Sequence, residues 1–299
     1  MSSAEVAVSI FKTLEPEDLR MLQAIEKGMS NREYVPKPQL QKYTKLPMDR
    51  IEFELSRLDK LGLLYRMQGG YVGYTINYAA YDCLAISAFV RAEVLEAFGK
   101  PIGVGKEADV FDALDPKGVR VAVKFHRLGR ISFRQTRRKR GYMTDRAGWL
   151  FQSRLAAEKE FEALKLVHKH GVAVPEPICQ NRHVIVMGMI EGGELGKWRE
   201  IEDPLKVLLE ILVNVRRAYL DAGVVHGDMS EYNVILQPDM HVLIIDWPQF
   251  VTKDHPNAED LLVRDVKNVL DYFVRKFKVT VSLKDACDFV SGKTETLKF

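Results

Sequence analysis

The sequence predicts an α+β fold in which a small module of helices and a hairpin precedes a larger unit of strands and long helices. Two observations lead to this prediction. Residues 1–80 contain short stretches with apolar residues at helical spacing, followed by two strand-like runs joined by Gln68-Gly69-Gly70. Residues 99–299 alternate strand-like runs with long amphipathic stretches, several of which end at glycines.

The first module has the element order of a winged helix-turn-helix domain. The apolar spacing predicts helices within residues 17–27, 38–46 and 49–61, and the strand-like runs are residues 63–67 and 71–76. Three helices followed by a hairpin predict a winged helix domain over residues 1–80. Residues 81–98 then read as a connecting helix that ends at Gly99.

The rest of the chain reads as one catalytic unit without internal repeats. Strands are predicted over residues 101–111, 119–125 and 183–190, with two short strands between residues 226 and 246. Helices are predicted over residues 149–170, 204–222 and 259–277.

The composition is that of an ordinary globular protein, with 46% hydrophobic and 28% charged residues. No run approaches the roughly 18 apolar residues needed to cross a bilayer, and residues 1–10 lack the pattern of a secretory signal. Cys83, Cys179 and Cys287 are far apart, which argues against a disulfide framework or a zinc site. We therefore expect a protein of the reducing cytoplasm and no membrane partner.

The strongest chemical signal is a loop between apolar runs, residues 225–236. Asp228 and Asn233 are five positions apart and can point into one site from a loop that turns back on itself. Asp246 ends the next apolar strand. Asp228 can orient or deprotonate an attacking hydroxyl or water, and Asn233 and Asp246 offer oxygen ligands to Mg²⁺. The alternative is a simple Asp/Asn-rich turn, but the second aspartate argues against it.

A lysine upstream completes a pattern for phosphate binding. Strand alternation places Lys124 and the small Ala122 on the same face, which suits a cleft where an adenine lies flat and the ammonium reaches its phosphates. Taken alone, Lys124 would also fit a solvent-facing edge strand. A long predicted helix downstream offers an acidic partner, for which we favour Glu160 over Glu158.

Two glycines precede the lysine strand. Gly103 and Gly105 allow the backbone to come close to a phosphate, and Lys106 follows directly. Ala108 stands where a third glycine would complete G-x-G-x-x-G, so the motif is weak by itself. Its position one hairpin before Lys124 is what gives it weight.

The order and spacing of these residues resemble the protein-kinase signature. However, His-Gly-Asp at residues 226–228 replaces His-Arg-Asp, and Asp-Trp-Pro at residues 246–248 replaces Asp-Phe-Gly. Only 53 residues follow Asp246, and they contain no Ala-Pro-Glu. The usual activation segment and peptide-docking helices therefore do not fit.

The sequence is most similar in pattern to the RIO family of atypical kinases. The family signature is similar to residues 226–233 and 245–249. Within the family the chain resembles the type-2 branch, which has an N-terminal winged helix, through residues 34–36, 105–107 and 123–126. The resemblance covers essentially the whole chain.

This resemblance implies a truncated bilobal kinase domain, with an N-lobe at residues 99–190 and a C-lobe at residues 191–299. ATP would bind between the lobes, with its adenine hydrogen-bonded to backbone around Met189 and Ile190, beyond a gatekeeper-like Met187. The implied cofactors are ATP and Mg²⁺.

The resemblance also implies roles for the motif residues. Asp228 would be the catalytic aspartate, and Asn233 and Asp246 the metal ligands, with Ser and Thr as the usual substrate residues. The type-2 branch is better regarded as an ATPase switch in small-ribosomal-subunit maturation, in which the aspartate at the position of Asp246 becomes transiently phosphorylated.

The charge is concentrated in one segment, which predicts a polyanionic partner. Residues 124–146 hold nine Lys/Arg against one acid, whereas the whole chain has a net charge of +3. Phe133 and Tyr142 are interleaved, which suits phosphates and exposed bases of rRNA. We expect a ribosomal precursor to bind here and at the winged helix. The alternative is a solvated loop without a partner.

The winged helix itself argues against sequence-specific DNA binding. Residues 48–66 contain four acids and four bases, so the predicted recognition helix lacks the positive charge that dominates DNA affinity. Two further residues are ambiguous. We expect His226 to pack under the catalytic loop, and Asp265 either braces that loop or is a surface acid.

Three functions remain in competition. The first is a RIO-type ATPase and kinase acting on the pre-ribosome. The second is a nucleotide-sensing, rRNA-binding assembly factor with little turnover. The third is a DNA-binding regulator with a vestigial kinase domain, and the intact catalytic positions argue against it.

Overall fold

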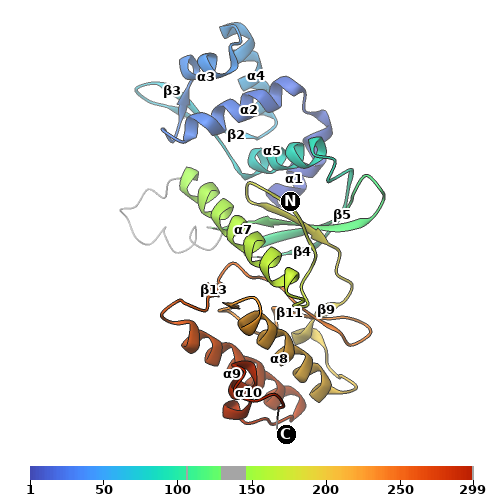
Figure 1. The fold of residues 1–299 in the computed structure, drawn as a ribbon. Coiled ribbons are helices and arrows are strands. Elements are labelled where there is room, and N and C mark those ends of the chain that lie inside the picture. Colours follow the sequence, from blue (N-terminus) through green and yellow to red (C-terminus); the bar gives the residue numbers. More distant parts are fainter. Residues whose placement is uncertain (106, 129–145, 298–299) are drawn as a thin grey trace. The chain divides into compact units, whose positions relative to one another are not determined.

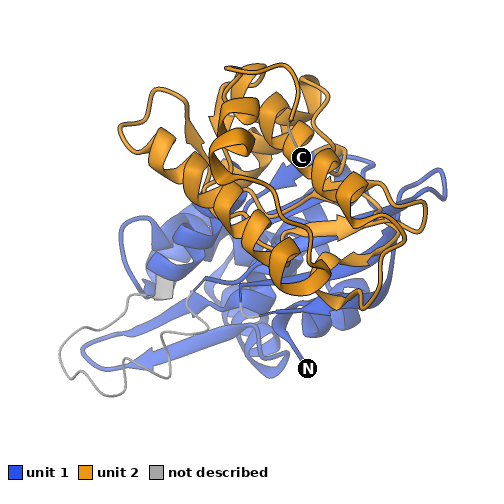
Figure 2. Cartoon of the chain, turned by 90° about the horizontal axis from the view of Figure 1, so that it is seen from below, with its two compact units in different colours: residues 1–158, 179–186 blue, residues 159–178, 187–299 orange. Residues whose placement is uncertain are grey.

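The computed structural model describes residues 1–105, 107–128 and 146–297 (Figure 1). The chain forms two compact units, coloured separately in Figure 2: residues 1–158 with 179–186, and residues 159–178 with 187–299. The first unit contains the winged helix together with most of the sheet that follows, and the predicted boundaries at residues 80 and 190 stay predictions. Among the described residues, no helix is both long and apolar enough to cross a bilayer.

The winged helix order predicted from the sequence is confirmed. Its helices are α2 (Pro16–Met29), α3 (Lys37–Thr44) and α4 (Met48–Lys60). The hairpin strands β2 (Leu64–Gln68) and β3 (Val72–Ile76) are joined by β1 (Val35–Pro36) into a sheet of order β1-β3-β2. The apolar faces of α2 and α4 form the centre of this module, because Leu22, Ile25, Ile51 and Leu55 are all buried.

The N-terminus adds two elements that the sequence analysis did not predict. These are α1 (Ser3–Ile10) and the short 3₁₀ helix η1 (Phe11–Thr13). A capping box starts α1, because the Ser2 side chain accepts from the N–H of Glu5 while the Glu5 carboxylate accepts from the N–H of Ser2. Helix α1 packs against α5.

The predicted connecting helix over residues 81–98 is wrong at its C-terminal end. Helix α5 spans Tyr78–Arg91 and is capped by Asn77, which accepts from the N–H of Ala80 at 3.0 Å. The chain turns at Glu93, which has a left-handed φ of 55°. Residues 97 and 98 already belong to strand β4 (Ala97–Val104). Their apolar spacing continues the helical pattern, but both are half-buried residues of a strand.

A five-stranded sheet of order β4-β5-β6-β8-β7 follows. Its other strands are β5 (Ala108–Leu114), β6 (Arg120–His126), β7 (Pro177–Asn181) and β8 (Val184–Gly188). The single strand predicted over residues 101–111 is thus a hairpin, with its turn between Val104 and Ala108. Strand β6 buries Val121, Val123 and Phe125, as its alternation predicted. The long helix α7 (Arg146–Lys169) comes next in the chain after the basic segment.

The second unit is built on α8 (Pro204–Leu220), α9 (Ala258–Phe277) and α10 (Leu283–Val290), which contact one another. The first two confirm predicted helices, whereas α10 and β7 were not predicted. The unit also contains β9 (Gly193–Glu194), the 3₁₀ helix η2 (Leu195–Lys197), β10 (Val224–Val225), β11 (Val234–Leu236), β12 (Val242–Ile244) and β13 (Val251–Thr252). The five strands form two small sheets, of order β12-β11-β9 and β10-β13.

Candidate active site

The register of β11 and β12 brings two of the predicted site residues together. Val234 pairs with Ile244, so Asn233 and Asp246 lie at the same end of this antiparallel pair. The N–H of Ile245 donates to the carbonyl oxygen of Asn233 at 2.9 Å, which extends the pairing beyond the strands. Asn233 therefore stands beside the residue that precedes Asp246.

The loop that carries Asp228 is fixed by helix α9. The buried Asp265 carboxylate accepts the N–H of Gly227 at 2.7 Å and the N–H of Met229 at 3.1 Å. Arg264 donates to the carbonyl of Gly227, and Asn268 donates to the carbonyl of Met229 at 3.1 Å. Of the two readings left open for Asp265, the brace is therefore correct.

Burial also changes the acidity of Asp265. Loss of water around the carboxyl raises its pKa, and the two backbone N–H bonds act in the opposite direction. These bonds fix the backbone on both sides of Asp228. The Asp228 side chain itself is exposed to solvent.

His226 packs under the loop, as predicted, and links it to the strand end at Asp246. Its Nδ1 accepts the N–H of Asp228 at 3.2 Å, so Nε2 carries the proton and donates to the carbonyl of Ile245 at 3.0 Å. Its ring contacts the buried Trp247, with centroids 4.6 Å apart. One imidazole thus fixes the backbone at both aspartates.

The backbone at these positions is unusual. Gly227 has φ of 80°, and a Cβ there would lie 2.8 Å from the carbonyl oxygen of Gln249. Asp246 has φ of 69°, which is uncommon for a residue with a side chain and occurs mostly where function requires it. The sequence signal for Gly227 was its replacement of the arginine found in the common kinase motif.

The side chains fit a magnesium ion. The amide nitrogen of Asn233 donates to the carbonyl of Asp228 at 2.8 Å, which leaves Oδ1 as the atom able to bind a cation. Asp246, the residue after the backbone partner of Asn233, is half-buried and supplies a carboxylate. Oxygen ligands from one carboxylate and one amide, with room for substrate phosphates, are what Mg²⁺ prefers.

The first unit contains three more of the predicted residues, Lys124, Gly103 and Gly105, in and beside its sheet. Lys124 is a half-buried residue of β6 and pairs with Val110 on β5. Gly105 closes the β4–β5 turn by donating its N–H to the carbonyl of Ala108 at 2.8 Å, and a Cβ on Gly105 would lie only 3.1 Å from that oxygen. A Cβ on Gly103 would meet no atom within 4 Å, so no neighbour requires a glycine there. Lys106 lies outside the described residues.

The two candidate acids of α7 differ in environment. Glu158 accepts from Nε of Arg154 at 2.7 Å in a partly exposed pair. Glu160 is 1% exposed. Glu160 is therefore the acid that α7 directs into the interior.

Three further predicted residues surround the end of β8. Met187 is buried, and Met189 and Ile190 directly after the strand are half-buried. The N–H of Gly188 donates to the carbonyl of Glu176 at 2.8 Å, which fixes the strand end. These residues belong to the second unit, whereas Lys124 and the two glycines belong to the first.

Most of the basic segment, residues 129–145, lies outside the described residues. Arg127 is described, and it does not belong with the basic residues counted as available to a polyanion. Its guanidinium is 1% exposed and contacts Asp82 at 2.8 Å and Asp109 at 3.2 Å. Asp82 also contacts Nε2 of His183 at 2.6 Å, and burial lowers the pKa of His183 to about 4. Arg127 therefore holds the first unit together and does not face a polyanion. Sequence spacing gave no signal for this cluster.

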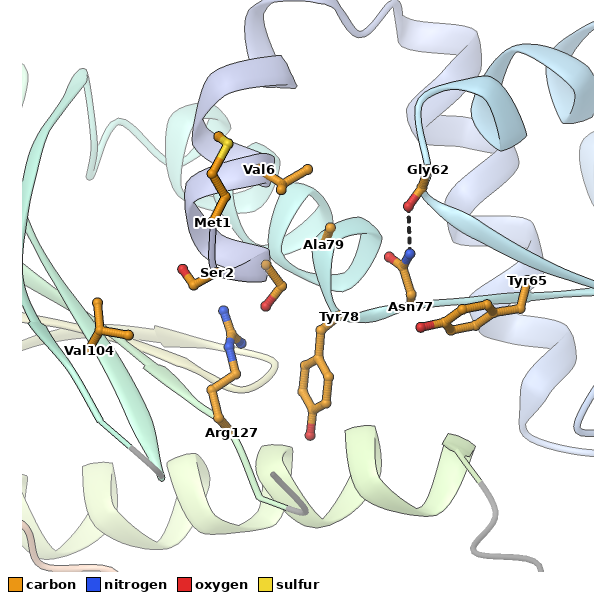
Figure 3. Close-up of a pocket in the computed structure, with 11 residues that line it drawn as sticks. Met1, Ser2, Val6, Gly62, Tyr65, Asn77, Tyr78, Ala79, Val104 and Arg127 are labelled. Atoms are coloured by element: carbon orange, nitrogen blue, oxygen red, sulfur yellow. Dashed lines mark hydrogen bonds between the residues drawn. The ribbon is translucent and has the colours of Figure 1, made fainter. Parts of the chain in front are cut away.

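A cavity of about 640 Å³ lies beside Arg127 (Figure 3). The start of the chain, the first residues of α5 and the side chains of Tyr65, Val104 and Arg127 line it. Its described lining includes no residue predicted to bind a nucleotide.

Comparisons with known proteins agree over most of the chain. The RIO domain family matches residues 109–286, and the family described as Rio2, N-terminal matches residues 11–92. The RIO-type serine/threonine-protein kinase Rio2 of Methanocaldococcus jannaschii is 41% identical over 258 residues, which cover 84% of this chain and 93% of that protein. The serine/threonine-protein kinase rio2 of Schizosaccharomyces pombe is 37% identical over 274 residues, covering 91% and 79%.

A solved structure is similar in fold as well. The Rio2 kinase–ADP/Mg²⁺–phosphoaspartate complex from Chaetomium thermophilum matches with a TM-score of 0.83 and 34% sequence identity. The match covers 95% of this chain and 89% of that one.

Proposed function

The chain belongs to the RIO family of atypical protein kinases, in its Rio2 branch, and from this premise we propose that it transfers the γ-phosphoryl group of ATP at Asp228, Asn233 and Asp246. The observation that carries the proposal is the double link made by His226, which ties the backbone of Asp228 to the residue before Asp246. Phosphoryl transfer depends mainly on positioning and charge, and this link supplies positioning.

Further predicted residues contribute to ATP binding in this proposal. The Lys124 ammonium binds phosphate oxygens and is oriented by the buried Glu160. The backbone at Gly103, Gly105 and Lys106 covers the phosphates, which the open space at Gly103 supports. Adenine hydrogen-bonds to the backbone at 189–190, with Met187 beside its ring.

The transfer step uses the exposed carboxylate of Asp228. It accepts a hydrogen bond from the attacking hydroxyl of a Ser, Thr or water and takes its proton as the new O–P bond forms. The bond between the γ-phosphorus and the bridging oxygen breaks, and ADP leaves. Bound Mg²⁺ neutralises the charge on the phosphates, and Asn233 and Asp246 would hold it.

We further propose Asp246 itself as a transient phosphoryl acceptor. The related Rio2 kinase structure contains a phosphoaspartate, which supports this step by similarity. A carboxylate oxygen of Asp246 would attack the γ-phosphorus, and ADP would leave with the bridging oxygen. Water then hydrolyses the acyl phosphate and restores the carboxylate, so one ATP yields ADP and phosphate.

The test gives purified protein γ-labelled ATP and Mg²⁺ and follows both free phosphate and label retained on the protein. Asp228→Ala and Asp246→Ala are compared with Asp254→Ala, an exposed aspartate of the same unit. We expect phosphate release to be lost in the first two variants and kept in the third. Label on the wild type should be released by hydroxylamine and absent in Asp246→Ala.

Other outcomes would change the proposal. Label that resists hydroxylamine and requires Asp228 would indicate transfer to Ser or Thr instead of Asp246. If the wild type gave neither phosphate nor label above the variants, even with ribosomal RNA present, the enzyme proposal would fail. A nucleotide-sensing scaffold would then take its place.

We also propose a small-subunit ribosomal precursor as partner and the cytoplasm as location. The basic residues 130–146 supply the charge for rRNA. On the winged helix, Arg50 contacts Glu17 and Glu54, and Arg57 contacts Glu15 and Asp18. Because acids of the same module neutralise these arginines, the arrangement argues against sequence-specific DNA binding by the winged helix. The described Cys83, Cys179 and Cys287 are free thiols, which fits a reducing compartment.

Affinity measurements test the RNA proposal. We expect single-stranded or structured rRNA to bind more tightly than duplex DNA of equal length, with a steep salt dependence. Replacing Arg137, Arg138 and Arg140 by Ala should reduce both the affinity and the salt slope. Equal affinity for DNA and RNA would contradict it.

A further inference from the structure

Tyr232 is an exposed aromatic residue inside the loop that carries the catalytic residues. Its side chain is 63% exposed, the highest value among the exposed tyrosines and phenylalanines of the described residues. It directly precedes Asn233, whose carbonyl accepts the N–H of Ile245, the residue before Asp246. An aromatic ring left in solvent at this position calls for an explanation, since the other apolar residues of the loop, such as Met229, are buried.

The loop holds Tyr232 in place. The N–H of Asn233 donates to the carbonyl of Ser230 at 3.1 Å, which closes a turn with Tyr232 at its outer corner. Just before it, Glu231 is fixed by its carbonyl, which accepts the N–H of Gly196 at 3.0 Å, and by a 2.8 Å ion pair with Arg275.

Gly196 supports the ring itself. A Cβ on this glycine would lie 3.5 Å from Cε1 of Tyr232 and 3.2 Å from Cγ of Glu231. The ring of Tyr232 therefore rests against backbone of η2 on one side and faces solvent on the other. An exposed aromatic ring with a fixed orientation is prepared for contact, because little side-chain entropy is lost when a partner covers it.

We propose that Tyr232 is a substrate-positioning residue, which packs against an apolar side chain of a polypeptide beside the phosphoacceptor Ser or Thr. This inference rests on the proposed phosphoryl transfer and names the substrate class of the same site. Tyr232 lies in the same loop as Asp228, so this loop can supply the contact.

The surrounding charges favour a polypeptide over RNA. Asp228 and Asp246 are anionic, whereas the acids Glu231 and Glu194 are balanced by Arg275 and Lys197. A nucleic-acid backbone at Tyr232 would bring phosphates toward a net negative surface. A peptide with an apolar side chain meets no such repulsion.

The experiment measures KM and kcat for serine peptides at saturating ATP and Mg²⁺. In this peptide series, one position next to the serine is varied at a time among Gly, Leu, Phe, Lys and Glu. Wild type, Tyr232→Ala and Tyr232→Phe are compared, with Phe151→Ala as a control at another exposed aromatic residue. We expect Tyr232→Ala to raise KM for the Leu or Phe peptide about tenfold, as loss of one apolar contact implies, with kcat within about twofold. Tyr232→Phe should restore the wild-type KM.

Other results would overturn the inference. An unchanged KM in Tyr232→Ala would exclude a substrate contact, and a fall in kcat together with a lower melting temperature would indicate a merely structural role. Loss of binding to fluorescent oligouridine with unchanged peptide kinetics would assign the ring to RNA. If the wild type hydrolyses ATP but phosphorylates no peptide, this inference fails and the proposed function stands. If it does neither, both fail.

Discussion

A Cβ atom on Gly227 would lie 2.8 Å from the backbone carbonyl oxygen of Gln249. Because Gly227 also has a left-handed φ of 80°, a side chain there meets both a steric and a conformational barrier. The loop that carries Asp228 and the segment after Asp246 therefore approach each other more closely than an arginine at position 227 would allow. The His-Gly-Asp order is a requirement of this packing.

Gly227→Ala should consequently lower both stability and activity. The left-handed backbone costs about 1 kcal/mol for alanine, and the overlap with Gln249 should bring the loss to about 2–4 kcal/mol. The natural control is Gly223→Ala, since Gly223 also has a left-handed φ, of 68°, but no atom lies within 4 Å of its added Cβ. Urea unfolding and ATP hydrolysis would be compared. Equal losses in the two variants would show that the contact with Gln249 does not matter.

Arg127→Met should destabilise the first unit strongly. It leaves the carboxylates of Asp82 and Asp109, both fully buried, without their cation, at a cost of about 3–5 kcal/mol. Arg120→Met removes an exposed contact with Asp112 and should cost less than about 1 kcal/mol. The midpoint of urea unfolding measures both. A small effect at Arg127 would mean that one of the two aspartates takes up a proton.

Sequence reasoning grouped the candidate site residues more readily than it found the contacts that hold them. Asp228, Asn233 and Asp246 lie on one loop and its neighbouring strand, so their spacing carries the signal. The cluster of Arg127, Asp82 and His183 joins residues up to 101 positions apart, and no local pattern encodes such a contact.

Two features, the end of α5 and the role of Asp265, could not be settled from local sequence. The end of α5 was placed too late because the apolar residues after Arg91 keep helical spacing while the chain turns at Glu93. Whether Asp265 braces the loop or faces solvent depends on a contact 36–38 residues away, which the sequence leaves open. Tertiary contacts decided both cases.

Asn233→Ala should increase the requirement for magnesium. The variant loses the oxygen proposed as a metal ligand, and it leaves the carbonyl of Asp228 without the amide donor at 2.8 Å. The Mg²⁺ concentration for half-maximal ATP hydrolysis should rise about 10–100-fold. Asn257→Ala is the control, because the Asn257 side chain makes no capping hydrogen bond to α9. An unchanged Mg²⁺ dependence would remove Asn233 from the metal site.

The last prediction concerns two buried acids in the winged helix, Glu54 on α4 and Asp18 on α2. Both are fully buried, and neither oxygen of Glu54 nor Oδ1 of Asp18 receives a hydrogen bond from another group. Arg50 lies 3.0 Å from Glu54 but does not offset the burial. Burial, followed by the neighbouring carboxyl of Asp18, raises the pKa of Glu54 to about 7.

The sign of the resulting pH dependence follows from proton binding. Between the usual carboxyl pKa and about 7, the folded state holds a proton on Glu54 that the unfolded state has released, so stability falls as pH rises through this window. His183 acts in the opposite direction, since its lowered pKa makes stability fall as pH drops from its ordinary value toward about 4. A difference between variants is therefore needed to isolate Glu54.

Glu54→Gln should remove the fall in stability that Glu54 causes as pH rises. Glutamine keeps the shape and can donate to Asp18, so the variant should gain about 1 kcal/mol or more relative to wild type at pH 8 and little at pH 5. Glu52→Gln, at an exposed position of the same helix that contacts Lys37, should show no such trend. Urea midpoints for the three proteins between pH 5 and pH 8 provide the measurement. A constant difference between Glu54→Gln and wild type across this range would mean that Glu54 is already ionised at pH 5, with Arg50 compensating its charge.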